Sequence, residues 1–89
     1  MAVRVPSPEA VAIMRDNVAR IVTVTDAQVL AAMGHYYLDT HNVAEGAGAA
    51  PLAALLAERE RNEGARVGVV LTGGNVDAAL FRRALDTLD

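Results

Sequence analysis

The chain has 89 residues, a net charge of −3 and a hydrophobic content of 53%. This length suits one small domain, and the scarcity of aromatic residues indicates a core of alanine, valine and leucine. The absence of cysteine excludes disulfides, thiolate catalysis and most zinc sites. The positive charges are scattered arginines, so nucleic acid is not an expected partner. No apolar run reaches the ~20 residues of a membrane helix, and a cytoplasmic protein is expected.

The first elements predicted along the chain are a helix and a strand. Ser7 is a suitable N-cap, and Pro8 suits the first helical position because its missing N–H costs nothing there. These two residues predict a helix over residues 8–19. The β-branched run Ile21–Val24 then predicts a strand.

Two further helices are predicted in the middle of the chain. Thr25 and Gln28 have the spacing of a capping box, and they predict a helix over residues 26–40. After a stretch of small residues, another helix is expected to run to Asn62. Pro51 should lie in its first turn, which places its regular start near residues 48–50.

The last part of the chain predicts a strand, a turn and a helix. Val67–Leu71 is uniformly apolar, which is typical of a strand buried on both faces. Asn75 is expected to cap a helix over residues 76–88. The order helix, strand, helix, helix, strand, helix predicts an α/β fold with a parallel pair. Because two strands make a poor sheet alone, we expect part of a larger three-layer, parallel-sheet domain.

The turn between the second strand and the last helix is a candidate binding site. Ligands of open α/β sheets bind at the carboxyl ends of strands. Gly73 and Gly74 would let the backbone approach a flat or anionic ligand, and the Thr72 hydroxyl would point at it. Alternatively, the glycines only change the chain direction and the Thr72 hydroxyl is satisfied locally. A small nucleotide- or anion-binding module built on this turn is a third possibility.

Glu45 is the other candidate, because it is a single carboxylate among small side chains. It could face a ligand pocket, or it could be a solvated residue ahead of a helix, where the helix dipole favours negative charge. His35 and His41 lie on different faces and have no third ligand in register. We therefore expect no metal site.

Four segments of the sequence, taken together, resemble one enzyme family. In their order and spacing they are similar to the end of the PLP-dependent threonine/serine dehydratases, which have the tryptophan-synthase-β-like fold, or fold type II. The segments are AVRVPSPEAVAIMR, RIVTVTDAQVLAAM, THNVAEGAGAAPLAALL and VGVVLTGGNVD. The resemblance implies that residues 1–89 are the C-terminal part of the PLP-binding large domain.

The same resemblance implies a cofactor site at Thr72, Gly73, Gly74 and Glu45. The family usually has a serine at the position of Thr72, and its hydroxyl hydrogen-bonds the pyridine nitrogen of PLP. Glu45 matches an acidic residue near the cofactor. A neutral hydroxyl makes the ring a weaker electron sink than a carboxylate would, which suits elimination of water from serine or threonine.

The chain departs from the family because it contains no lysine, and the family's Schiff-base lysine is therefore absent, as is its phosphate loop. The prediction is the C-terminal portion of an ammonia-lyase that converts L-threonine or L-serine to a 2-oxo acid and ammonia. Alone it should be inactive and bind PLP weakly or not at all. Its expected partners are the missing N-terminal portion or a homologous chain, in a homo-oligomer. The alternative is a non-catalytic interaction or oligomerisation protein derived from this fold, which the high apolar fraction favours.

Overall fold

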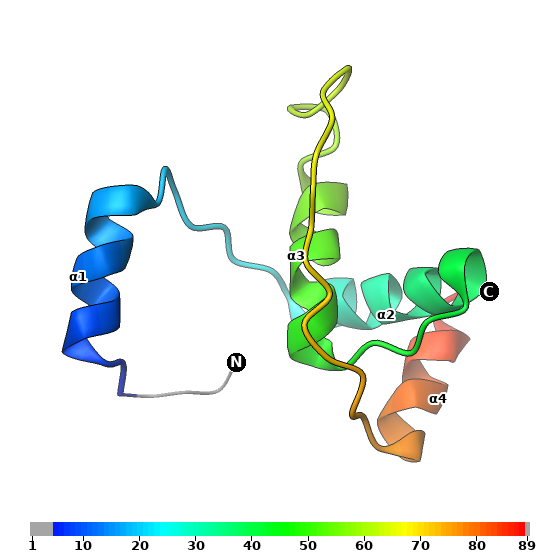
Figure 1. Ribbon diagram of the computed structural model, residues 1–89. Coiled ribbons are helices and arrows are strands. Elements are labelled where there is room, and N and C mark those ends of the chain that lie inside the picture. The colour runs from blue at the N-terminus through cyan, green and yellow to red at the C-terminus, as the bar shows by residue number, and fades with distance from the viewer. Residues whose placement is uncertain (1–4, 89) are drawn as a thin grey trace.

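The computed structural model describes residues 5–88 and places four helices within them. These are α1 (Pro8–Asn17), α2 (Asp26–Thr40), α3 (Gly46–Ala57) and α4 (Ala78–Asp86). Figure 1 shows α3 and α4 at the two ends of α2, while α1 stands apart. Both α3 and α4 pack against α2, and α1 packs against no other described helix. None of these helices has the length and apolar character needed to cross a membrane.

The limits of α2 follow from its capping residues. The Thr25 hydroxyl oxygen accepts a hydrogen bond from the Gln28 N–H at 3.1 Å. In return, Gln28 Oε1 accepts one from the Thr25 N–H at 2.8 Å. This reciprocal pair satisfies amide groups that have no partner in the first turn of a helix. The helix predicted over residues 26–40 is confirmed.

The core lies where α3 and α4 meet α2. Small residues allow this close packing: a Cβ atom added to Gly34 would lie 2.8 Å from the carbonyl oxygen of Ala84 in α4. The buried side chains of α3 are those of Ala49 and Ala53. The buried hydrophobic residues are Val29, Ala32, Met33, Ala44, Ala49, Ala53 and Ala84. Alanine dominates this core, with one valine and one methionine, whereas the expected leucines are only partly buried at its edge.

The two predicted strands are not formed within residues 5–88. Ile21–Val24 and Val67–Leu71 are both non-helical, unpaired chain. Figure 1 shows the second of them running beside α3 as a single stretch. A strand needs a neighbour that accepts and donates its backbone hydrogen bonds, and neither segment has one in the described structure. Both apolar runs are non-helical chain in the described structure. The parallel pair of strands predicted for them is not formed there.

The third helix differs from its prediction at both ends. It begins at Gly46 instead of residues 48–50, so that Pro51 lies inside it. The proline nitrogen has no hydrogen to donate, and the helix lacks one backbone bond there. The helix ends at Ala57 rather than Asn62, and turns follow as far as Gly64. Gly64 has a φ of 79°, in the region that favours glycine, but it is not the helix cap.

The last helix begins later than predicted, at Ala78. Its N-cap is Asp77, not Asn75, because Asp77 Oδ1 accepts a hydrogen bond from the Leu80 N–H at 2.8 Å. It ends at Asp86, before the predicted residue 88. Its first turn thus takes its cap from a carboxylate, which the helix dipole also favours.

The first helix contributes nothing to the core. It ends at Asn17 instead of residue 19, and none of its residues is buried. The segment after it is tied to the end of α3 by an ion pair between the Arg20 guanidinium and the Glu58 carboxylate. The hydrogen bond from Arg20 is the main cause that lowers the pKa of Glu58. The same contact raises the pKa of Arg20.

Candidate functional site

The structure brings the two candidate segments of the sequence together. The backbone N–H of Glu45 donates a hydrogen bond to the carbonyl oxygen of Gly73, with a nitrogen–oxygen distance of 3.0 Å. This bond joins the loop before α3 to the turn that follows Val67–Leu71. Residues almost thirty positions apart in the sequence therefore share one backbone contact.

Three glycines make this contact possible. A Cβ atom on Gly48 would lie 2.6 Å from the carbonyl oxygen of Gly73. One on Gly73 would lie 2.6 Å from Glu45 Oε1, and one on Gly74 would lie 2.5 Å from the carbonyl oxygen of Val43. Cβ atoms are essentially never found so close to another heavy atom. A side chain at Gly48 or Gly74 would meet a backbone carbonyl oxygen and push the segments apart, whereas one at Gly73 would displace the end of the Glu45 side chain.

The glycines at positions 73 and 74 thus have a structural task within the chain itself. Their open Cα faces receive the Glu45 carboxylate and the Val43 carbonyl group. The sequence assigned them a different task, which is to lie beside a cofactor ring. That assignment stays a prediction, because the described contacts are all within the protein.

Glu45 occupies the N-cap position of α3 but does not cap it with its side chain. The residue is half-buried, and its carboxylate turns toward Gly73. As the N-cap residue, Glu45 stands at the end of α3 where the helix dipole favours a negative charge. Both interpretations made from the sequence, a charge near a helix and a charge facing a site, are compatible with this position.

Thr72 is exposed, so its hydroxyl is open to a ligand rather than enclosed in the core. The next residue, Gly73, is the one bonded to Glu45. Thr72 is therefore adjacent in the chain to the residue whose carbonyl group is bonded to Glu45. These are the residues that the sequence had singled out separately.

The sequence reasoning missed Gly48 and Val43 as parts of this site. Gly48 was expected only near the regular start of the helix, without a contact of its own. The signal was present in the sequence, because glycine within a helix costs roughly 0.5–1 kcal/mol relative to alanine and usually has a packing reason. The identity of the atom it packs against, the carbonyl oxygen of Gly73, is visible only in three dimensions.

Comparison with known proteins gives the context of the site. Residues 1–73 match the family described as pyridoxal-phosphate dependent enzymes. This match includes Glu45, Gly48, Thr72 and Gly73, which are the residues brought together above. No solved structure matches the chain.

Several curated proteins are similar to this chain. One is an L-threo-3-hydroxyaspartate ammonia-lyase of Pseudomonas sp., 42% identical over 82% of this chain and 23% of its own length. A second is a putative threonine dehydratase of Sinorhizobium fredii, 38% identical over 74% of this chain and 20% of its own. A third is an L-threonine ammonia-lyase of Geobacter sulfurreducens, 38% identical over 86% of this chain and 19% of its own.

These comparisons agree with the resemblance that the sequence motifs carry. The chain spans about a fifth of the length of the curated relatives that it matches. The family match itself extends over most of the chain. The chain therefore belongs to the pyridoxal-phosphate dependent enzymes.

Proposed function

We propose that this chain is the C-terminal portion of an ammonia-lyase that acts on a β-hydroxy amino acid, L-threonine or L-serine. The overall reaction eliminates water and then releases ammonia by hydrolysis, which leaves a 2-oxo acid. The names of the relatives support this class of reaction. The proposal includes a cytoplasmic protein that assembles with copies of itself.

The observation that carries the proposal is the exposed Thr72 in a turn held against Glu45. A hydroxyl in this place can donate a hydrogen bond to the ring nitrogen of pyridoxal phosphate without adding a charge. Pyridoxal phosphate, when bound, supplies the electron sink for the elimination. The chain's own part is to position the Thr72 hydroxyl through the hydrogen bond from Glu45 to Gly73.

The chain contains no lysine, so the residue that binds the cofactor covalently must come from another part of the enzyme. We therefore propose that it is inactive alone and works with an N-terminal portion or a homologous chain. The unpaired segments Ile21–Val24 and Val67–Leu71 support this, because each has the composition of a buried strand. Strands from the partner would complete the parallel sheet expected from the sequence.

A chimeric enzyme tests the proposal. The segment of the Geobacter sulfurreducens L-threonine ammonia-lyase that matches this chain is replaced by the chain, and 2-oxo acid release from L-threonine and L-serine is measured. We expect an active enzyme in which Thr72→Ser keeps the activity. Thr72→Val, which has the same shape without a hydroxyl, should lower kcat by roughly tenfold or more. An active chimera with equal rates for both variants would contradict the role of Thr72.

A non-catalytic interaction protein is the second candidate, and exposed apolar residues favour it. Ile21 is 75% exposed and Val70 is 70% exposed, although both belong to strand-like runs. Where such residues form a contiguous patch, they mark an interaction surface. This function predicts oligomers in sedimentation experiments without any cofactor, and a strictly monomeric, folded chain would count against it.

A further inference from the structure

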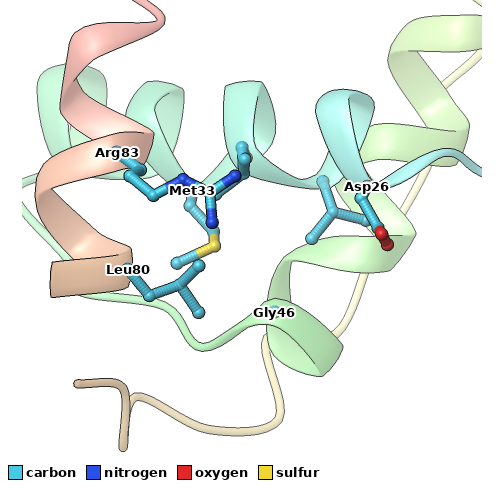
Figure 2. A pocket seen from close by; sticks show the side chains of 7 residues that line it. Asp26, Met33, Gly46, Leu80 and Arg83 are labelled. Atoms are coloured by element: carbon cyan, nitrogen blue, oxygen red, sulfur yellow. The ribbon is translucent and has the colours of Figure 1, made fainter. Parts of the chain in front are cut away.

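A cavity of about 210 Å³ lies between α2, α4 and the beginning of α3. Its walls are apolar and come from Val29, Leu30 and Met33 of α2 and from Leu80 of α4. Figure 2 shows the side chain of Leu80 beside that of Met33. Gly46, which follows Glu45 in the chain, also lines the cavity, whereas Thr72, Gly73 and Glu45 themselves do not.

The cavity has charges of opposite sign at its two ends. Figure 2 shows Arg83 reaching from α4 toward Met33, and Asp26 at the far end of α2 beside α3. Within residues 5–88, Arg83 has no ion-pair partner, since the ion pair found there joins Arg20 to Glu58. An arginine at an apolar cavity offers a planar set of donors that suits a carboxylate.

We propose that this cavity binds a short aliphatic monocarboxylate. The carboxylate would be held by the Arg83 guanidinium, and the hydrocarbon chain would lie on Leu30 and Leu80, which keep exposed surface at the cavity. Asp26 at the other end disfavours a second negative charge, so a dicarboxylate should bind less well. This inference is independent of the proposed lyase function, because it uses none of the residues of the cofactor site.

The cavity is small and partly open to solvent. Its volume of about 210 Å³ suits a small organic ligand, and valerate is a five-carbon probe of that class. Ligands of this size, in a site with one charged contact, bind with dissociation constants in about the millimolar range.

A titration of the chain followed by amide NMR shifts tests the proposal. The probes are valerate, valeramide, acetate and glutarate. We expect saturable shifts at Met33, Gly46 and Leu80 with valerate, and binding at least about tenfold weaker with valeramide, which lacks the charge. Acetate lacks the hydrocarbon chain and glutarate carries a second carboxylate, so both should also bind more weakly than valerate.

Variants of neighbouring arginines provide matched controls. Arg83→Gln should weaken valerate binding by about tenfold, because it removes the charge at the cavity. Arg82→Gln removes the same charge one residue away, where the side chain does not line the cavity, and should change the affinity by less than about twofold. Arg83→Lys keeps the charge without the planar donors and should give an intermediate affinity. Circular dichroism checks that each variant keeps its helices.

Three results would overturn the proposal. Equal binding of valerate and valeramide would show that the charge is not recognised. Equal losses in Arg83→Gln and Arg82→Gln would show attraction by the general surface charge instead of the cavity. Shifts that do not saturate, or that fall outside the cavity residues, would show that valerate has no site there.

Discussion

Two regions of this molecule are similarly apolar but differ in what they bury. The helical body, made of α2, α3 and α4, holds nearly all the buried side chains. The arm, residues 8–25, has apolar residues at comparable spacing, yet α1 buries none of them. Ile13 is 63% exposed and Met14 is 44% exposed, whereas Met33 in α2 is fully buried. An apolar helical stripe therefore forms a core only where a second surface faces it.

The largest expected difference between the two regions comes from a pair of methionines. Met33→Ala removes a fully buried side chain, and we expect the free energy of unfolding to fall by about 3 kcal/mol. Met14→Ala removes the same atoms from the arm and should change the free energy of unfolding by less than about 0.5 kcal/mol. Urea denaturation followed by circular dichroism measures both. Equal effects would mean that the arm is also packed in solution.

A pair of glycines sharpens the same comparison by adding atoms. Gly34→Val places a Cβ 2.8 Å from the Ala84 carbonyl oxygen and should cost about 2 kcal/mol, because α2 and α4 must separate. Gly68→Val is its control, since no atom lies within 4 Å of a Cβ at that position. It should change the free energy of unfolding by less than about 0.5 kcal/mol. A neutral Gly34→Val would contradict the close contact between α2 and α4.

The helix caps give a smaller expected difference. Thr25→Ala removes half of the capping box of α2 and should lower the free energy of unfolding by about 1 kcal/mol. Ser7 is the N-cap of α1 but makes no side-chain hydrogen bond there. Ser7→Ala should therefore change it by less than about 0.5 kcal/mol. Thermal unfolding scans compare the two variants. A larger loss of stability in Ser7→Ala than in Thr25→Ala would contradict these capping roles.

The ion pair that joins the regions gives the smallest expected effect. The Arg20 guanidinium lowers the pKa of the Glu58 carboxyl in the folded chain. The pair thus stabilises the fold at pH values above the unfolded pKa of Glu58, and this contribution is lost as the pH falls through the folded pKa. Arg20→Gln should raise the pKa of Glu58 toward its ordinary value, as measured by carboxyl NMR titration.

A matched arginine on the arm controls that titration. Arg15→Gln removes a positive charge that does not act on Glu58, so the pKa of Glu58 should stay low. A change of equal size in the two variants would indicate an effect of net charge alone. A Glu58 pKa that is ordinary in the unchanged chain would show that the contact is not maintained in solution.

The reliable part of the sequence prediction was local. The capping box of Thr25 and Gln28 gave both the start and the existence of α2, because all its atoms lie within one turn. The strands failed because a strand is defined by bonds to a neighbour, and Ile21–Val24 has none in the described structure. The start of α3 was predicted too late because Pro51 was expected to lie in the first turn. Helix α3 accommodates the proline inside it, where Ala49 and Ala53 are buried and one backbone hydrogen bond is missing.

The candidate site was predicted only as separate residues. Glu45 and Gly73 each stood out from their surroundings, but nothing in their spacing showed that they would be hydrogen-bonded. The role of Gly48 depends on the position of a carbonyl group far along the chain. Contacts of this kind follow from how the segments pack, and pattern reading along one sequence does not contain that information.

The bond between the Glu45 amide and the Gly73 carbonyl has one consequence for how the site can change. Because it joins main-chain atoms, replacing the Glu45 side chain removes the carboxylate but leaves the anchor of the turn intact. The backbone amide of Glu45 thus holds the turn in place, while its side chain supplies the negative charge. Variation at position 45 can alter the chemistry presented to a ligand without moving the turn, whereas a side chain at Gly48 or Gly74 would meet a backbone carbonyl oxygen and displace it.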